Sequence, residues 1–143
     1  MNVATILQHK GANVVTARPD ASIAEISKLL HSCRIGAVVI SSDRLHVDGI
    51  LSERDIIRIL AERGEEALSL PASAVMTREV TTCRPDDDAA RLMGVMTERR
   101  FRHLPVCEDG ALVGLVSIGD VVRVRVDEIE HEAAALRDYV THG

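Results

Sequence analysis

The chain has 143 residues and a formal net charge of −5, and 46% of its residues are hydrophobic although only 1% are aromatic. This composition excludes a disordered chain and indicates a core of aliphatic side chains. The acidic balance argues against a protein that coats nucleic acid, because such proteins neutralise phosphates with basic residues. The sequence has no run of about 20 apolar residues and no signal-peptide pattern, so we expect a cytoplasmic protein without membrane contact.

The first half of the chain alternates apolar segments with turn residues. Arg18-Pro19-Asp20 ends a short strand and opens a helix, because proline and aspartate favour the first positions of helices. Apolar residues from Ile23 to Leu30 recur at helical spacing, and Ser52 stands between a strand and the next helix. In chain order, the expected elements are a strand over 14–16, a helix from 23, strands over 37–40 and 47–51, and a helix through 56–60.

The second half repeats the first. Segment 80–86 matches 14–20, and Gly114–Asp120 matches Gly49–Asp55 with one residue fewer in between. The expected elements here are a strand over 80–82, a helix from 89, strands over 104–107 and 112–116, and a helix through 121–124. Each repeat is therefore β-α-β-β-α, and neither small sheet can cover both of its faces alone. We expect an α+β fold, similar to an α/β sandwich, in which the two repeats pack about a pseudo-twofold axis.

The expected organisation is repeat 1 at 1–66, repeat 2 at 67–126 and a C-terminal helix at 127–143. The run 72–77 resembles 3–7 as the start of a repeat. In the C-terminal segment, one apolar stripe recurs at helical spacing, formed by Ile129, Ala133, Leu136 and Val140. Such a stripe is more often a core or dimer seam than a ligand site.

The sequence contains no pattern typical of a catalytic or metal site. Cys33, Cys83 and Cys107 form no Cys-x-x-Cys pair and have no histidine at ligand spacing, so we expect them to be reduced and mostly structural. There is no nucleophile with a base at defined spacing and no Gly-rich phosphate loop. We therefore expect no enzyme activity, no catalytic cofactor and no metal. The histidines expected on the surface are His9, His31, His46, His131 and His142.

The two strand-to-helix junctions carry a resemblance to a known family. Gly49-Ile50-Leu51-Ser52-Glu53-Arg54-Asp55 and Gly114-Leu115-Val116-Ser117-Ile118-Gly119-Asp120 share the pattern Gly-apolar-x-Ser-x-x-Asp. Arg102-His103-Leu104-Pro105-Val106 precedes the second junction, whereas the first copy has Gly36-Ala37-Val38-Val39-Ile40 without proline. Over nearly its whole length the chain resembles a pair of cystathionine-β-synthase (CBS) domains, known as a Bateman module.

The resemblance implies a regulatory module that binds an adenosyl compound in the cleft between the repeats. AMP is the favoured ligand, and ADP, ATP, NAD and S-adenosylmethionine are further candidates. It also implies a homodimer and an unidentified regulated protein as partners. The alternative is a dimerisation scaffold with a vestigial nucleotide cleft. The presence of both junction aspartates, Asp55 and Asp120, favours the sensor.

The junction residues are chemically suited to a nucleoside. A carboxylate in the first turn of a helix is stabilised there and accepts hydrogen bonds from both ribose hydroxyls, so Asp55 and Asp120 are the ribose candidates. Ser52 and Ser117 cap the helix or bind a phosphate. Ordinary helix capping is the alternative, because Ser-x-x-Asp also fits a capping box. Capping and ligand binding can coexist.

The base and the phosphate groups of a nucleotide bind to different kinds of residue. An apolar slot at the sheet edges suits the base, and its expected walls are Thr16, Ala17, Ala37, Val38, Thr82, Cys83, Leu104 and Pro105. These residues equally fit plain core strands. Arginine offers a planar fork of donors for phosphate oxygens, and the expected basic group is Arg54, Arg100, Arg102 and His103. A solvated basic strand edge is the alternative. Because the second junction has Ile118-Gly119 in place of Glu53-Arg54, the two sites should differ.

Overall fold

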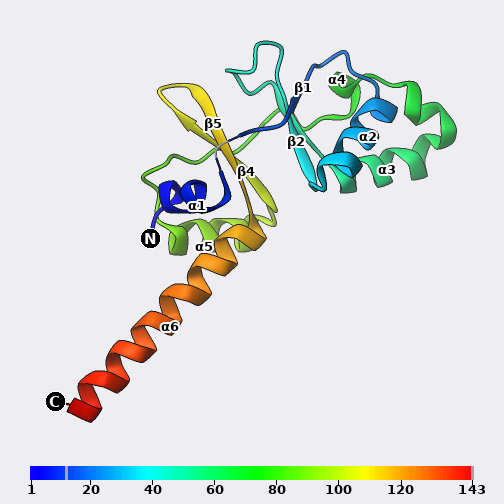
Figure 1. Ribbon diagram of the computed structural model, residues 1–143. Coiled ribbons are helices and arrows are strands. Elements are labelled where there is room, and N and C mark those ends of the chain that lie inside the picture. Colours follow the sequence, from blue (N-terminus) through cyan, green and yellow to red (C-terminus); the bar gives the residue numbers. More distant parts are fainter. Residues whose placement is uncertain (12, 143) are drawn as a thin grey trace.

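The computed structural model describes residues 1–11 and 13–142, which form two lobes and a helix that projects from the second lobe (Figure 1). The helices are α1 (Val3–Lys10), α2 (Ile23–Cys33), α3 (Glu53–Arg63), α4 (Ala72–Val75), α5 (Ala89–Arg99) and α6 (Ile118–His142), with the 3-10 helix η1 (Gly64–Ser69). The strands are β1 (Thr16–Ala17), β2 (Ala37–Ile40), β3 (Gly49–Ser52), β4 (His103–Glu108) and β5 (Ala111–Ser117). The mixed α+β architecture agrees with the predicted fold class.

The first lobe is a three-stranded sheet covered by helices. β2 lies in the middle, parallel to β1 and antiparallel to β3. All four residues of β2 are buried, as expected of a central strand that is covered on both faces. Ile23, Ile26 and Leu30 of α2 form one apolar stripe that packs in the same core as Ile56 of α3. The predicted β-α-β-β-α order is therefore confirmed in the first repeat.

The second lobe follows the same plan with a smaller sheet. β4 and β5 pair antiparallel, and His103 lies opposite Ser117 just as Ala37 lies opposite Ser52 in the first lobe. The side chains of α5 cover this pair. Matching positions in the two lobes can therefore be compared residue by residue.

The strand predicted over 80–82 is wrong. Only Cys83 makes a bridge in this region, to Val106 of β4. The reason is that Thr77 pairs with Ile50 of the first lobe, through hydrogen bonds of 2.9 and 3.0 Å. This pairing holds the chain near the first lobe until it reaches β4 at Cys83.

Each repeat donates its leading helix to the other lobe. α1 places Val3 in the core of the second lobe, and α4 places Ala72 in the core of the first. Matching backbone hydrogen bonds hold both helices: the Val3 N–H donates to the Asp87 carbonyl at 3.0 Å, and the Ala72 N–H donates to the Ala21 carbonyl at 2.7 Å. The core of the second lobe therefore combines α1 at the start of the chain with residues from Cys83 onward, whereas the core of the first lobe lies within the stretch 15–76.

The first glycine of each junction lies against this exchanged segment. A Cβ on Gly49 would lie 2.5 Å from Met76 Sδ and 2.9 Å from the Thr77 carbonyl oxygen. A Cβ on Gly114 would lie 2.7 Å from Cδ2 of Leu7. The close approach of the exchanged segment therefore favours glycine at both positions, most strongly at Gly49, where a backbone oxygen is the neighbour.

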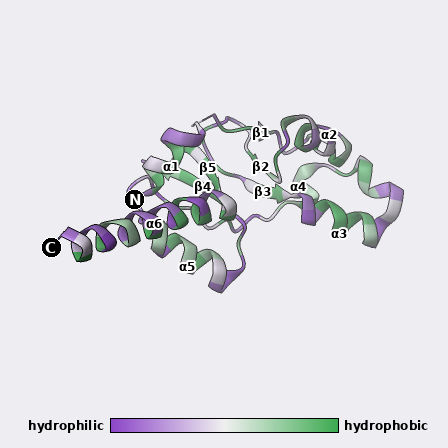
Figure 2. Ribbon diagram, turned by 60° about the horizontal axis from the view of Figure 1, so that its bottom comes forward, coloured by the Kyte–Doolittle hydropathy of each residue, from purple (hydrophilic) through white to green (hydrophobic). Residues whose placement is uncertain are grey.

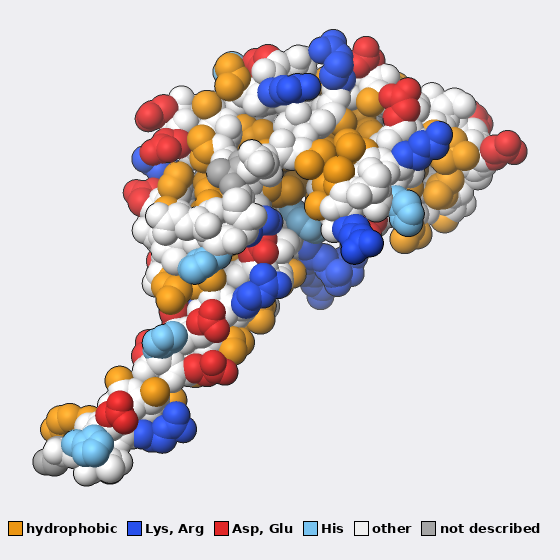
Figure 3. All heavy atoms as spheres, viewed as in Figure 1, with side chains coloured by type: hydrophobic (Ala, Val, Ile, Leu, Met, Phe, Trp, Pro, Cys, Tyr) orange, Lys and Arg blue, Asp and Glu red, His pale blue; other side chains and the backbone are white. Residues whose placement is uncertain are grey.

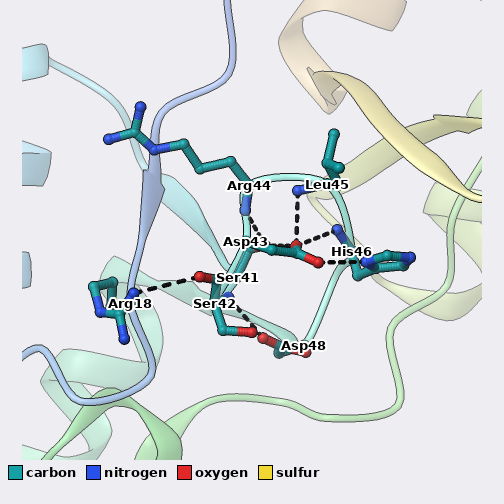
Figure 4. A network of polar contacts seen from close by, with 8 residues as sticks. All are labelled: Arg18, Ser41, Ser42, Asp43, Arg44, Leu45, His46 and Asp48. Carbon is teal, nitrogen blue, oxygen red and sulfur yellow. Dashed lines mark hydrogen bonds and ion pairs between the residues drawn. The ribbon is translucent and has the colours of Figure 1, made fainter.

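The loop between β2 and β3 also connects the lobes (Figure 4). The Asp43 carboxylate accepts hydrogen bonds from the N–H groups of His46 and Leu45, at 2.8 and 2.9 Å, and lies beside His46 Nδ1. The hydrogen bonds from His46 hold the pKa of Asp43 well below its usual range, and the carboxylate in turn raises the pKa of His46. The Leu45 carbonyl then accepts a hydrogen bond from the Leu112 N–H of β5 at 2.7 Å. A rigid loop of the first repeat is thereby bound to the second sheet.

The two helices predicted for the end of the chain are a single helix. α6 runs without a break from Ile118 to His142, since no proline and no glycine after Gly119 interrupts it. Its first turns place Val121 and Val124 in the core of the second lobe. From Ile129 onward every described residue is exposed, and Figure 2 shows hydrophobic and hydrophilic residues alternating along this part.

The surface prediction for five histidines is confirmed, since His9, His31, His46, His131 and His142 are all exposed. Cys83 is buried in the second core, and burial raises the pKa of its thiol to about 12, so it packs as an unreactive apolar side chain. Cys33 is exposed near the end of α2. The expectation of structural cysteines therefore fits Cys83 but not Cys33.

Candidate functional site

A cleft of about 250 Å³ lies where the two repeats meet. Four segments form its walls: Gly36 and Ala37 at the start of β2, the β3–α3 junction, residues 77–81, and residues 100–104 at the start of β4. The first two belong to repeat 1 and the last to repeat 2. The cleft exists only because the tertiary fold brings these distant segments together.

Asp55 is fixed at one side of this cleft by a capping box. The Ser52 N–H donates to Asp55 Oδ2 at 2.9 Å, and the Asp55 N–H donates to Ser52 Oγ at 3.3 Å. Arg58, one turn further along α3, lies 3.1 Å from Oδ1. The side chain of Asp55 remains 13% exposed. Capping is therefore present, and the carboxylate still has acceptor capacity on Oδ1 for a ligand.

Three arginines also line the cleft. Arg54 from the junction and Arg100 and Arg102 from the second repeat line it, all with exposed side chains. Among the described residues, none of these three guanidinium groups has an ion-pair or hydrogen-bond partner. Arg100 ends α5 in the left-handed conformation, with φ of 59°. Three arginines without acidic partners are therefore available to a bound anion.

His103 follows these arginines and is half-buried in the cleft wall. Burial lowers the pKa of its imidazole below the usual value, so the ring is neutral at pH 7. A neutral imidazole can donate one hydrogen bond and accept one. The ring therefore offers polar contacts without adding to the positive charge.

The acidic groups of the cleft offset its arginines. Glu53, Asp55 and Glu79 line it together with the three guanidinium groups. The formal charges of these six side chains cancel. A site of this kind has donors for one phosphate group but no large excess of positive charge for a triphosphate.

Apolar side chains complete the cleft between its charged sides. They come from both repeats and from the chain that connects them, and they are Ala37, Ile50, Val80, Phe101 and Leu104. A planar base can pack against such a surface while backbone groups at the rim contact its edge. The arrangement thus combines an apolar slot, a carboxylate and unpaired arginines.

The second junction has the same capping geometry but a different neighbour. The Ser117 N–H donates to Asp120 Oδ2 at 2.9 Å, and the Asp120 N–H donates to Ser117 Oγ at 3.1 Å. Lys10 Nζ donates to the same Oδ2 at 2.6 Å and to the Leu115 carbonyl at 2.9 Å. Burial alone would raise the pKa of Asp120, but the hydrogen bonds from Lys10 and Ser117 outweigh it and lower that pKa.

Helix length explains this difference between the junctions. α1 continues to Lys10, whereas its counterpart α4 ends at Val75 after four residues. In the first lobe the Ile50 carbonyl accepts a backbone hydrogen bond from Thr77, and in the second the matching Leu115 carbonyl accepts from the Lys10 side chain. The longer helix therefore brings an ammonium group onto Asp120.

Comparison with known proteins identifies the family. The model of the CBS domain family matches residues 5–62 and 72–127. The chain belongs to the CBS domain family. Its two CBS domains form a tandem pair, as the junction motifs predicted. No group of three or more His, Cys, Asp or Glu residues in the described part of this CBS pair is placed to hold a metal ion, and no helix described there is long and apolar enough to cross a membrane.

Solved structures include close relatives of this CBS pair. The CBS-domain containing protein ATU1752 from Agrobacterium tumefaciens is 44% identical, with a TM-score of 0.84, covering 87% of this chain and 99% of that one. The CBS domain pair of protein MJ0100, solved in complex with 5'-methylthioadenosine and S-adenosyl-L-methionine, is 26% identical, with a TM-score of 0.79 over 90% of this chain and 98% of its own. CBS domain-containing protein CBSX3, mitochondrial, from Arabidopsis thaliana is 34% identical over 87% of this chain, which spans 62% of that protein.

The structure gathers part of the predicted site in one cleft of the CBS pair. The predicted residues that line it are Ala37, Ser52, Arg54, Asp55, Arg100, Arg102, His103 and Leu104. Ser117 and Asp120 lie at the second junction instead, beside Lys10. The CBS pair is thus asymmetric at its two junctions.

Other predicted site residues lie outside this cleft. Thr16 and Ala17 line a separate hollow beside α2, because β1 is the strand furthest from β3 in its sheet. Thr82 faces another hollow beside α5. The remaining three are buried in the interior: Val38, Cys83 and Pro105.

Several cleft residues were missed by sequence reasoning. Val80 and Thr81 form the wall that had been assigned to Thr82 and Cys83, because the chain joins β4 two residues later than the predicted strand implies. Phe101 stands in sequence between two candidate arginines, and this was an available signal. Thr77 and Glu79 had no such signal, since the pairing of Thr77 with the first lobe brings this segment to the cleft.

Proposed function

We propose that this CBS pair is a regulatory sensor that binds one adenosyl ligand, with AMP favoured, in the cleft beside Asp55. The observation that carries this proposal is the convergence of a fixed carboxylate, three unpaired arginines and an apolar slot in one cleft between the repeats. The adenosyl ligands of MJ0100 support the ligand class. The sensor acts as a homodimer in the cytoplasm, on a partner protein, and its role is regulatory and not catalytic.

Each chemical part of AMP has a counterpart in the cleft. The ribose hydroxyls donate to Oδ1 of Asp55, and the adenine packs between Val80 and Leu104. The single phosphate accepts hydrogen bonds from Arg54 and Arg102. A monophosphate is favoured over a triphosphate because Glu53 and Glu79 offset the arginine charge.

Isothermal titration calorimetry with AMP, GMP, ATP and S-adenosylmethionine tests this function. AMP is expected to bind with one site per chain and at least tenfold more tightly than GMP, because fixed polar groups at the rim of the slot reject a base with a different pattern of donors and acceptors. Equal affinities for AMP and GMP would contradict adenine recognition. Failure of every adenosyl ligand would favour the alternative of a dimerisation scaffold.

The single-site prediction depends on Lys10. Lys10 bonds to Oδ2 of Asp120 and to the Leu115 carbonyl, so its ammonium group lies where a second ribose would approach this junction. The second junction also has Gly119 where the first has Arg54. The Lys10→Met variant keeps most of the length of the side chain but removes the ammonium group. It is expected to bind a second equivalent of adenosine, a ligand without phosphate, while AMP binding at the first cleft stays unchanged.

Calorimetric stoichiometry with adenosine measures this change. The matched control is Lys28→Met, because Lys28 is exposed on α2, outside both junctions. It should bind one equivalent like the unchanged protein. Two equivalents in the unchanged protein, or one in Lys10→Met, would contradict the role given to Lys10.

A further inference from the structure

The projecting part of α6 carries a heptad pattern. Its apolar residues follow alternating steps of four and three from Val122 to Val140, which is the spacing of a coiled-coil seam. The seam residues are Val122, Val126, Ile129, Ala133, Leu136 and Val140. Four of these side chains are more than 40% exposed: Val126 at 46%, Ile129 at 53%, Leu136 at 64% and Val140 at 74%. The seam is therefore open to solvent along the projecting helix.

The base of α6 leaves this seam free. Val121 and Val124 face the core of the second lobe, on the other side of the helix from the seam. Glu128 lies 2.9 Å from the N-terminal amine of Met1 and also pairs with Arg125. The buried valines and the pair between Met1 and Glu128 hold the base of the helix to the lobe, and the remainder projects into solvent (Figure 1).

Charged residues flank the seam in a complementary order. Val126, Ala133 and Val140 occupy position a of the heptad, and the other seam residues occupy position d. In a parallel coiled coil, the residue just before each position a contacts the residue five positions later on the partner helix. Arg125 then meets Glu130 of the partner subunit, and Glu132 meets Arg137 of the partner subunit. Both contacts join opposite charges, and twofold symmetry repeats them. Figure 3 shows acidic and basic side chains beside hydrophobic ones along this helix.

An antiparallel pair that overlaps the whole seam has the opposite electrostatics. It places Arg123 beside Arg137 of the partner subunit, and Glu130 and Glu132 each beside their own copies. Like charges at these positions are destabilising. The flanking charges therefore select the parallel orientation. Valine at two of the three a positions, Val126 and Val140, favours two strands.

From this pattern we propose that α6 pairs with α6 of a second copy as a parallel two-stranded coiled coil. The proposal rests on the homodimer in the proposed function and specifies its interface and orientation. The two ligand-binding bodies then lie at the same end of the coil.

Charge reversal tests the interface by sedimentation velocity at several concentrations. Glu132→Arg places two arginines in contact and is expected to raise the dimer dissociation constant roughly tenfold. The double variant Glu132→Arg with Arg137→Glu exchanges the charges and is expected to restore wild-type association. Asp138→Arg makes the same charge change at a position facing away from the seam and should leave the mass unchanged. Leu136→Asp is expected to halve the mass.

Disulfide formation tests the orientation. In a Cys33→Ser background, Val140→Cys lies beside its own copy in a parallel coil but about 27 Å from it in the antiparallel overlap. Mild oxidation is therefore expected to give a covalent dimer in high yield. Each helix variant should bind AMP as the unchanged protein does, which separates this interface from ligand binding.

Three outcomes would overturn the coiled coil. Because association depends on protomer concentration, a monomer mass for the unchanged chain at about 100 micromolar would exclude this coiled coil. A mass unaffected by both Leu136→Asp and Glu132→Arg would place the dimer interface elsewhere. Failure of the Val140→Cys variant to crosslink in a proven dimer would exclude the parallel orientation.

Discussion

Replacing Asp55 by alanine is expected to weaken AMP binding by about 2–4 kcal/mol, or roughly 30- to 1000-fold, because two charge-assisted hydrogen bonds to the ribose are lost. The free energy of unfolding should fall by only about 1 kcal/mol, the usual contribution of a helix cap. The larger effect on binding follows from the position of the carboxylate. Oδ2 serves the cap, Oδ1 lies 3.1 Å from Arg58, and Asp55 lines a cleft that also holds three unpaired arginines.

Asp55→Asn separates the two roles further. Its side-chain oxygen can still accept the hydrogen bond from the Ser52 N–H, so stability should change less than in Asp55→Ala. Without the negative charge the ribose contact weakens, and most of the loss in affinity should remain.

Calorimetry with AMP and urea unfolding measure the two quantities for each variant. Asp120→Asn is the matched control, because Asp120 has the same capping box but is held by Lys10. It should leave AMP affinity unchanged. An Asp55 variant that loses stability yet binds AMP normally would show that the aspartate has only a structural role.

Replacing Gly49 by alanine is expected to lower the free energy of unfolding by about 3 kcal/mol, the upper range for overpacking a core. The added Cβ would lie 2.9 Å from the Thr77 carbonyl oxygen, which accepts a hydrogen bond from the Ile50 N–H. A backbone group held in this way cannot move without breaking the pairing between the lobes. Gly114→Ala should cost only about 1 kcal/mol, because its close neighbours are the terminal atoms of the Leu7 side chain, which can rotate.

Urea midpoints for both variants measure this difference. Gly94→Ala is the control, since a Cβ at this position in α5 meets nothing within 4 Å. It should stabilise the protein by up to about 1 kcal/mol through helix propensity. Equal losses at Gly49 and Gly114 would show that the fixed carbonyl does not determine the cost.

Much of the local structure could be predicted because its signals lie close together in the sequence. Ser22 and Asp88, at equivalent positions of the two repeats, cap α2 and α5, two residues after the Arg-Pro-Asp turns that were expected to open these helices. The junction Ser52–Asp55 needs only neighbours within one turn of helix. The basic run before β4 was found for the same reason, and Arg102 and His103 line the cleft together with Arg54.

The predicted walls of the cleft were less accurate because they depend on which strands face the other repeat. The repeat itself implied that residues 14–17 and 80–83 are equivalent, and it therefore implied two similar walls. In the structure β1 is at the far edge of its sheet, whereas Val80 and Thr81 reach the cleft. The different lengths of α1 and α4 also make the two strand-to-helix junctions unequal.

The tandem repeat, the order of helices and strands, the capped junctions and the CBS family could all be recognised in the amino-acid sequence, because each depends on spacing and on local hydrogen bonding. The exchange of α1 and α4, the location of the open cleft and the contact of Lys10 with Asp120 required the folded chain. Lys10 and Asp120 are far apart in the chain, and no local pattern encodes their contact. The contact follows from the packing of α1 in the second lobe. Burial of Val3 and Ile6 sets the direction of this helix, and the helix then places Lys10 beside Asp120.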